Sequence, residues 1–356
     1  MMTYEKRYIA SLKLPMQHDY PERQGNLIIL KAYNPEKNER GALYLQYSGS
    51  FQKMAALFDL EEIAYRYVLI LEPSTWGYYD PSFALFVGKP LDVIVLAQDE
   101  IDYDIIKDMN TNLIPLRLGA GDWIDFNRFK PVSIHGEKAF DVVMVASWLR
   151  IKRHSLLFKT LRDSCLQNIR VVLVGYPWEG RLRKDIEKEA ERFGVFNQIT
   201  FFENIPHAQV SSILSQSKVA TMLTKREGAN RGIYEAFFCD VPVILYRHNR
   251  GVNKHIINKH TGMLADDDEL GDAIKYMVAH YKEFRPREWA VANSGFVKAW
   301  EKLNATFLEV ERIRTGKKVD ELCMIKSDPN LVYAIDRDRI DLEPEYHKLI
   351  SYLRPC

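Results

Sequence analysis

The amino-acid sequence predicts an α/β protein with two doubly wound sheets, and three observations carry this prediction. Compact segments rich in Ile, Leu and Val recur along the chain. They are nearly continuous in hydrophobicity, which is typical of parallel strands that are covered on both faces. Segments with helical spacing of apolar residues separate them. The length of 356 residues is sufficient for two domains of ordinary size.

Composition excludes several classes of protein. Hydrophobic residues make up 47% and charged residues 27%, as in a folded globular protein. The 49 basic and 48 acidic side chains leave a net charge of +1, so no overall positive field argues for a nucleic-acid partner. The cysteines have no close spacing and are expected to be reduced thiols. No apolar segment approaches the roughly 20 residues that cross a bilayer. We therefore expect a cytoplasmic protein, with peripheral contact at the inner face of a membrane left open.

The first α/β series predicts an N-terminal domain over residues 1–132. Strands are expected at 27–31, 67–71, 92–97 and 113–116, and helical segments at 50–58, 81–87 and 104–109. The stretch 116–131 contains glycines, a proline at its end and little periodicity. Together with the polar segment 133–138, it is interpreted as the linker between the domains.

A second, more regular series predicts another domain over residues 133–284. Its five strands are expected at 140–146, 170–175, 198–202, 219–223 and 241–246, and its helices at 154–165, 182–193, 208–217, 231–239 and 268–281, with a short piece at 252–258. Ligands bind beyond the carboxyl ends of strands in such sheets, so the loops there should face one cleft. One long helix is expected over 285–314, followed by a tail, 315–356, of unknown role.

The stretch 225–246, KREGANRGIYEAFFCDVPVILY, contains the residues that point most directly to chemistry. Its middle has the apolar spacing of a helix, which places Glu227 in the preceding loop and Glu235 on the helix. Asn230 is the expected N-cap. A loop that opens onto a helix N-terminus favours a phosphate group, and carboxylates suit sugar hydroxyls. A sugar nucleotide combines both. On spacing alone, two ordinary acids near a helix start explain the pattern equally well.

The residues Glu227-Gly228, Glu235-Ala236 and Pro242-Val243-Ile244 resemble the signature of retaining glycosyltransferases of family 4, which have the GT-B fold. The similarity extends over 140–154, 170–175 and 251–274, and covers roughly 115–300. It implies two Rossmann-like lobes facing a central cleft, with the acceptor on the N-terminal lobe and the donor on the other. The helix 285–314 would pack back toward the N-terminal lobe.

The resemblance also implies roles for particular residues. Glu235 would hold the ribose hydroxyls, Glu227 the donor sugar, and Lys152 the donor diphosphate, so Glu227 and Lys152 are the expected catalytic residues. The family's arginine near the first strand of this lobe has no counterpart in register, because Ser147 occupies its place. The remaining donor-site candidates are the amides of Gly228, Ala229 and Asn230, with Ser147 and Arg150.

The acceptor side departs from the family pattern, since no histidine occurs in the expected loop of the N-terminal lobe. Arg40 and Gly41 are candidates for its glycine-containing loop, and Trp76 for an aromatic contact with a sugar. A short D-x-D motif, Asp102-Tyr103-Asp104, is interpreted as a chance match near a helix start. No metal site is expected.

The resemblance therefore implies a retaining hexosyltransferase-type glycosyltransferase (EC 2.4) of surface polysaccharide biosynthesis. Its donor would be a UDP- or GDP-linked sugar, its acceptor a glycan or lipid-linked glycan, and it would need no cofactor. Two alternatives stay open: a sugar-nucleotide epimerase on the same fold, and a non-catalytic sugar-nucleotide-binding protein.

Overall fold

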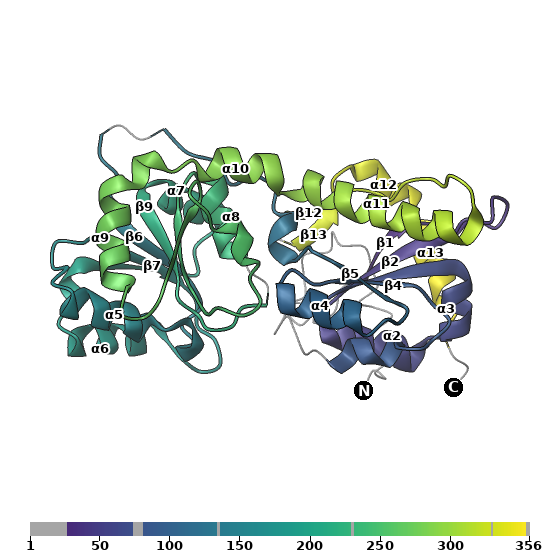
Figure 1. The fold of residues 1–356 in the computed structure, drawn as a ribbon, viewed down its shortest axis with the longest axis horizontal. Helices are drawn as coiled ribbons and strands as arrows, with labels where there is room; N and C mark the ends of the chain where they lie inside the picture. The colour runs from purple at the N-terminus through teal and green to yellow at the C-terminus, as the bar shows by residue number, and fades with distance from the viewer. Residues whose placement is uncertain (1–26, 74–80, 134–135, 229–230, 329, 354–356) are drawn as a thin grey trace. The chain divides into compact units, whose positions relative to one another are not determined.

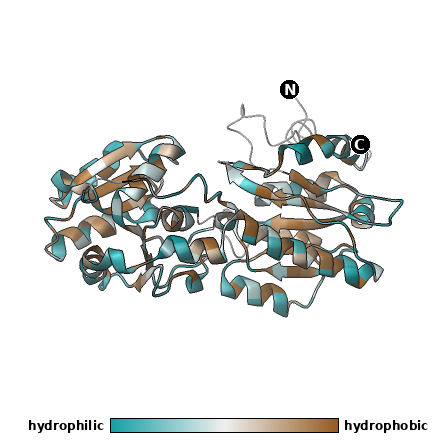
Figure 2. Ribbon diagram, turned by 90° about the horizontal axis from the view of Figure 1, so that it is seen from above, coloured by the Kyte–Doolittle hydropathy of each residue, from teal (hydrophilic) through white to brown (hydrophobic). Residues whose placement is uncertain are grey.

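A computed structural model describes residues 27–73, 81–133, 136–228, 231–328 and 330–353 (Figure 1). The chain forms two compact units. The first contains the described residues up to Trp123 together with those from Phe296 on, and the second runs from Ile124 to Gly295. The boundary thus falls within the stretch interpreted as a linker and before residue 132. Each unit has an apolar sheet between amphipathic helices, as the colouring in Figure 2 shows.

The first unit contains a five-stranded sheet in which the strands follow chain order. Its strands are β1 (Leu27–Lys31), β2 (Gly41–Gln46), β3 (Tyr67–Glu72), β4 (Val93–Leu96) and β5 (Leu113–Leu116). β1 is antiparallel to β2, and the other neighbours are parallel. The sequence did not predict β2. Its last residue, Gln46, is polar but buried, because its amide donates to Glu72 at 2.8 Å.

Short helices connect these strands. They are α2 (Ser48–Leu57), α3 (Leu60–Arg66), the 3₁₀ turns η1 (Pro81–Phe86) and η2 (Ala120–Trp123), and α4 (Glu100–Asp108). Asp59 caps α3 by accepting from the amide of Glu61 at 3.0 Å. Asp99 caps α4 in the same way through Ile101 at 2.9 Å. Asp102 of the D-x-D motif is buried on α4.

The C-terminal segment completes the first unit. It consists of α11 (Phe296–Thr315), β12 (Ile325–Asp328), β13 (Asn330–Tyr333), α12 (Asp336–Asp341) and α13 (Glu343–Ile350). Leu303 and Phe307 of α11 lie in the same core as the sheet. The hydroxyl of Tyr333 donates to the carbonyl of Ile29 at 2.7 Å, and the amide of Ile29 donates to Tyr346 at 3.0 Å. The tail therefore covers β1, which would otherwise be an open sheet edge.

The single helix expected over 285–314 is two helices, and this prediction is wrong. α10 (Pro286–Asn293) belongs to the second unit and α11 to the first. Gly295 lies between them with φ of +90°, a conformation that glycine adopts at little cost. Apolar periodicity continues on both sides of this break, which is why the sequence pattern does not reveal it.

The second unit contains a six-stranded parallel sheet with the order β11-β10-β9-β6-β7-β8. The strands are β6 (Phe140–Val145), β7 (Val171–Gly175), β8 (Ile199–Glu203), β9 (Ser217–Met222), β10 (Val243–Tyr246) and β11 (Gly262–Ala265). Five were expected. β11 is not among them, because it is a four-residue edge strand that begins with Gly262.

Helices cover both faces of this sheet (Figure 1). They are α5 (His154–Asp163), α6 (Arg183–Arg192), α7 (His207–Ser215), α8 (Arg231–Phe238), α9 (Leu270–His280) and α10, with short 3₁₀ turns η3 (Arg150–Lys152), η4 (Phe196–Gln198), η5 (Lys254–Ile256) and η6 (Tyr281–Glu283). The order of the strands reverses between β6 and β9. Such a reversal leaves a crevice at the carboxyl ends of the two strands, where ligands bind in sheets of this type.

Arg40 and Gly41, the candidates for the acceptor side, lie at the amino ends of the parallel strands of the first sheet. Ligands in such sheets bind at the other edge, beyond the carboxyl ends. β1 is antiparallel to β2, so the loop between them meets the amino ends of the parallel strands. Arg40 is buried between Glu311 at 2.8 Å and Asp92 at 2.6 Å. A Cβ on Gly41 would lie 2.4 Å from the carbonyl oxygen of Lys31. Both residues are explained by packing, and their assignment to the acceptor side is withdrawn.

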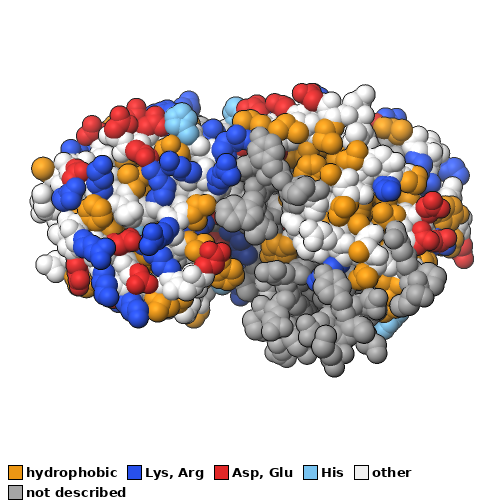
Figure 3. Space-filling model, turned by 90° about the horizontal axis from the view of Figure 1, so that it is seen from below, with side chains coloured by type: hydrophobic (Ala, Val, Ile, Leu, Met, Phe, Trp, Pro, Cys, Tyr) orange, Lys and Arg blue, Asp and Glu red, His pale blue; other side chains and the backbone are white. Residues whose placement is uncertain are grey.

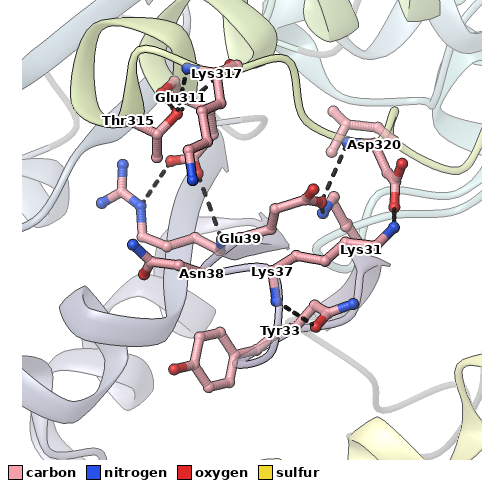
Figure 4. Close-up of polar contacts among 12 residues, drawn as sticks. Lys31, Tyr33, Lys37, Asn38, Glu39, Glu311, Thr315, Lys317 and Asp320 are labelled. Atoms are coloured by element: carbon pink, nitrogen blue, oxygen red, sulfur yellow. Dashed lines mark hydrogen bonds and ion pairs between the residues drawn. The ribbon is translucent and has the colours of Figure 1, made fainter.

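The surroundings of Arg40 join distant parts of the chain (Figure 4). Lys31 and Glu39 form an ion pair of 2.7 Å, and the same carboxylate accepts from the amide of Asp320 at 3.2 Å. Lys37 pairs with the side chain of Asp320 at 2.7 Å. These contacts attach the β1–β2 loop to the segment after α11.

Candidate active site

A pocket of about 550 Å³ lies at the carboxyl edge of the second sheet, where the strand order reverses. The ends of β6 and β7, the loops after β8 and β9, and the first turns of α7 and α8 form its walls. Its described lining residues are Val145, Ala146, Ser147, Lys152, Val174, Gly175, Tyr176, Asn204, Ile205, His207, Val210, Met222, Glu227, Arg231, Gly232 and Glu235. The pocket therefore has apolar walls and a few converging charged groups, as expected of a binding site for a small molecule.

Lys152 and Glu227 form an ion pair within this pocket. The Nζ atom of Lys152 donates to Oε2 of Glu227 at 2.6 Å, and their side chains are 18% and 12% exposed. Lys152 comes from the loop after β6 and Glu227 from the loop after β9. Two segments that are far apart in the sequence thus place opposite charges together at the carboxyl edge of the sheet.

The loop that carries Glu227 is held by its backbone. The amide of Glu227 donates to the carbonyl of Arg250 at 2.9 Å, and the amide of Arg250 donates to Lys225 at 2.9 Å. The side chain of Asn249, which is fully buried, donates to the carbonyl of Thr224 at 2.7 Å. The loop after β10 therefore supports the loop after β9 and fixes the position of the carboxylate.

The neighbouring Arg153 holds the loop of Lys152. Its backbone is left-handed, with φ of +64°, and separates η3 from α5. Its guanidinium donates to the carbonyl of Leu223 at 3.1 Å, pairs with Asp267 and lies 4.9 Å from the ring centre of Tyr246. These contacts explain Arg153 as an anchor of the loop.

Glu235 lies one helical turn after Arg231, and both line the pocket. Glu235 is only 6% exposed. Burial raises the pKa of its carboxyl group, and the positive charge of Arg231, whose Nε atom is 3.6 Å away, partly offsets this shift. A carboxylate in this position gains from ligand hydroxyl groups that donate hydrogen bonds to it.

Gly232 leaves room in the pocket between these two residues. A Cβ added there would have the side chain of Met222 as its nearest neighbour, at 3.5 Å. The first turn of α8 therefore presents backbone and open space at this point, where a ligand can approach closely.

The structure brings together four of the candidates from the sequence: Lys152, Glu227, Glu235 and Ser147. Arg150 is exposed, and neither it nor Gly228 is among the described residues that line the pocket. Ala229, Asn230 and Trp76 lie outside the described residues. The roles assigned to these residues stay predictions.

Sequence reasoning did not single out Tyr176, Asn204, His207 or Arg231, which also line the pocket. The first three follow β7 and β8, whose loops were expected to face the cleft. Their position at the carboxyl edge was the available signal. Arg231 was assigned to the start of a helix, and its spacing of four residues from Glu235 was the signal that places both on one face.

Side chains of both charge signs occur on the surface of the second unit. Figure 3 shows Lys and Arg side chains interspersed with Asp and Glu on its visible face. Among the described residues, no group of three or more acidic, His or Cys side chains is arranged to hold a metal ion. The helices in the described ranges are all too short or too polar to cross a membrane.

Comparisons with known proteins agree with this geometry. Residues 125–286 match the sequence model of the family "Glycosyl transferases group 1". No curated protein sequence matched the chain. The matched region coincides closely with the second unit, which contains the pocket.

Solved structures of glycosyltransferases share the fold at low sequence identity. The pneumococcal O-GlcNAc transferase GtfA, in complex with UDP and GlcNAc, is 15% identical, with a TM-score of 0.58 over 74% of this chain and 56% of that one. The sucrose-phosphate synthase of Thermosynechococcus elongatus is 17% identical, with a TM-score of 0.59 over 77% and 73%. The Anabaena protein HepE, in complex with UDP, is 13% identical, with a TM-score of 0.57 over 76% and 77%.

The chain thus spans little more than half of the pneumococcal enzyme, at 56% of its length. These likenesses establish the α/β fold of the GT-B glycosyltransferases. The family match confirms the resemblance first seen around Glu227 and Glu235. Residues 125–286 are thus similar in sequence to the glycosyl transferases group 1 family.

Proposed function

We propose that the protein is a glycosyltransferase that moves a hexose from a nucleotide-sugar donor to a glycan or lipid-linked glycan, with retention of the anomeric configuration. One observation carries the proposal. The pocket beside the reversal of strand order between β6 and β9 combines a lysine with two carboxylates, which come from different elements. A lysine suits the donor phosphates, and the carboxylates suit the hydroxyls of the ribose and the donor sugar.

Glu235 accepts hydrogen bonds from the ribose hydroxyls in this proposal. Its carboxyl group lies on α8, one turn from the helix start, where burial makes hydrogen-bond donors valuable. The donor phosphates lie nearer the start of α8 and Lys152. Backbone N–H groups at a helix start favour negative charge there.

Donor binding changes the partner of Lys152. Without ligand, its ammonium group pairs with Glu227 at 2.6 Å. A donor phosphate attracts the same ammonium group, and Glu227 then accepts hydrogen bonds from hydroxyls of the donor sugar. Exchange of one charged partner for another keeps Lys152 compensated throughout, which avoids the cost of an isolated charge in a half-buried site.

In the transfer step, the bond between the anomeric carbon and the phosphate oxygen breaks, and the electron pair stays on the phosphate. The acceptor hydroxyl oxygen bonds to the anomeric carbon on the same face, and its proton passes to the leaving phosphate oxygen. Lys152 stabilises the negative charge that develops on the leaving group. Preorganised charges of this kind are usually the largest contribution to catalysis. The step requires no metal or cofactor, and surface polysaccharide is the proposed product.

A thermal-shift screen with UDP, GDP, ADP and their sugars tests donor binding. A nucleotide present at 100 times its dissociation constant adds about 2.7 kcal/mol to the free energy of unfolding. We expect one nucleotide series to raise the melting temperature and the others to have little effect. No shift with any nucleotide diphosphate would contradict the proposal.

Product analysis separates the proposed transferase from its alternatives. A transferase given its donor alone releases free sugar and nucleoside diphosphate slowly. An epimerase yields an isomeric nucleotide sugar, and a binding protein leaves the donor intact. Chromatography of the nucleotide products after long incubation distinguishes these outcomes.

A further inference from the structure

We infer that Arg231 supplies the second positive charge of the donor site and binds the diphosphate opposite Lys152. The inference rests on the proposed function and names a residue for it that the sequence resemblance does not. Arg231 is the first residue of α8, whereas Lys152 comes from the loop after β6. The two cations thus approach the pocket from different elements.

The described lining of the pocket contains one lysine and one arginine, Lys152 and Arg231. His207 also lines it, but burial lowers the pKa of its imidazole, and the charges of Arg231 and Arg128 lower it further. His207 is therefore neutral near pH 7. The positive charge available to a phosphate ligand at the described surface comes from one lysine and one arginine.

Other arginines near β6 are placed elsewhere. Ser147, which occupies the position of the family's arginine, lines the pocket as a short neutral side chain. The guanidinium of Arg153 is engaged by Leu223 and Asp267. Arg150 is exposed and is not among the described lining residues. Among the described lining residues, the arginine of the pocket is thus Arg231.

Arg231 lies in the first turn of α8, where the helix itself favours an anion. A cation in the first helical turn lies at the positive end of the helix dipole, which disfavours it. The carboxylate of Glu235 lies 3.6 Å from the Nε atom of Arg231 and partly offsets this effect. An anion bound at the start of α8 interacts favourably with both the guanidinium and the helix.

The charges of the pocket explain why a diphosphate fits it. Lys152 and Arg231 are balanced by Glu227 and Glu235, each cation having its own carboxylate. A donor with a diphosphate bridge offers oxygens to both cations, while its sugar and ribose hydroxyls serve the two carboxylates. A monophosphate-linked donor offers fewer oxygens for two separated cations. The site therefore favours a nucleoside diphosphate sugar.

The test compares ligands that differ only in their phosphates. Calorimetric titration gives the affinities of the full-length protein for the best nucleoside diphosphate among UDP, GDP and ADP, and for the corresponding nucleoside. We expect Arg231→Gln to weaken the diphosphate about 10- to 100-fold, the loss of one charge-assisted hydrogen bond or a bidentate pair. Nucleoside affinity should change less than threefold.

Three variants complete the experiment. Lys152→Gln should also weaken the diphosphate, and Arg231→Lys should recover part of the affinity, because it keeps the charge but loses the planar fork. Arg183→Gln removes an arginine on α6 that pairs with Glu187 outside the pocket, and should leave all affinities unchanged. Circular dichroism confirms that each variant is folded.

Two outcomes would overturn the inference in distinguishable ways. If the parent binds a diphosphate, Lys152→Gln weakens it and Arg231→Gln does not, Arg231 lies outside the phosphate site while the proposed function stands. If the parent binds no nucleoside diphosphate, the proposed function fails and the inference fails with it.

Discussion

Two ion pairs, one in each unit, show how similar chemistry serves packing in one place and is available for binding in another. Arg40 and Glu311 in the first unit are 5% and 0% exposed and are 2.8 Å apart. Lys152 and Glu227 in the second unit are 18% and 12% exposed and are 2.6 Å apart. Both pairs join segments that are distant in sequence. The second pair lines a pocket.

The difference follows from the sheet edge at which each pair lies. Arg40 precedes β2, at the amino ends of the parallel strands, where α11 covers it. Lys152 and Glu227 follow β6 and β9, at the carboxyl ends of strands that diverge in order. Strand direction, more than residue type, therefore determines which charged side chains serve packing and which are available to a ligand.

The largest effect on stability is expected at the Arg40–Glu311 pair of the first unit. Arg40→Ala should lower the free energy of unfolding by about 3–5 kcal/mol, because it removes the guanidinium that pairs at 2.8 Å with the fully buried carboxylate of Glu311. Denaturant unfolding measures this change. Removal of the exposed Arg183–Glu187 pair by Arg183→Ala should cost about 1 kcal/mol or less. Equal effects of the two variants would contradict the distinction.

The largest effect on activity is expected at the Lys152–Glu227 pair of the second unit. Glu227→Gln should lower turnover about 100- to 1,000-fold, by analogy with the loss of one transition-state contact. It should change the melting temperature little, since Lys152 can turn to solvent. Steady-state kinetics with the donor identified by thermal shift measures the effect. A large loss of stability in this variant would place Glu227 with the structural pairs.

Glu235 should make nucleotide binding depend on pH. Because burial raises its pKa, it takes up a proton at higher pH than an ordinary glutamate. Protonation removes the charged acceptor for ribose hydroxyls, so affinity should fall as pH decreases through this raised pKa. Glu235→Gln should weaken the nucleotide about tenfold and abolish this pH dependence. Titrations across acidic to neutral pH test both statements.

The same pKa shift predicts the direction of a stability change. The folded-state pKa lies above that of the unfolded chain, so the protonated carboxyl favours folding. This contribution is present at low pH and is lost as pH rises through the folded-state pKa. Relative to Glu235→Gln, the parent should therefore become less stable over that rise, as measured by unfolding at several pH values.

The smallest effect is expected at Gly232. Replacement of a helical glycine by alanine should raise stability by about 0.5–1 kcal/mol, since the Cβ meets no atom closer than 3.5 Å. The added methyl group would also occupy space at the pocket wall, so nucleotide affinity should decrease slightly. A parallel measurement of melting temperature and dissociation constant would reveal these opposite changes. An increase in affinity would show that Gly232 does not face the ligand.

The strands of the second sheet could be predicted because they are buried on both faces and differ in period from the helices between them. β2 and β11 were missed for local reasons. β2 ends in a polar residue whose burial depends on Glu72, and β11 contains only four residues. The break at Gly295 could not be predicted, because apolar spacing continues on both sides of it. The two helices that it separates nevertheless pack into different units.

That Lys152, Glu227 and Glu235 lie at one pocket could be predicted because residue type and loop position agreed. Arg40 and Gly41 were misplaced because the antiparallel direction of β1 cannot be read from an apolar run. Arg231 was overlooked as a pocket residue because the direction of a side chain in a first helical turn depends on how the helix docks on the sheet.

Release of nucleoside diphosphate from the donor sugar tests the central claim most directly, with the parent, Glu227→Gln and Arg40→Lys compared under the same conditions. The account predicts that the parent releases diphosphate and free sugar, that Glu227→Gln does so about 100- to 1,000-fold more slowly, and that Arg40→Lys, where folded, matches the parent. Equal release by the parent and Glu227→Gln, or an isomeric nucleotide sugar as the product, would contradict it.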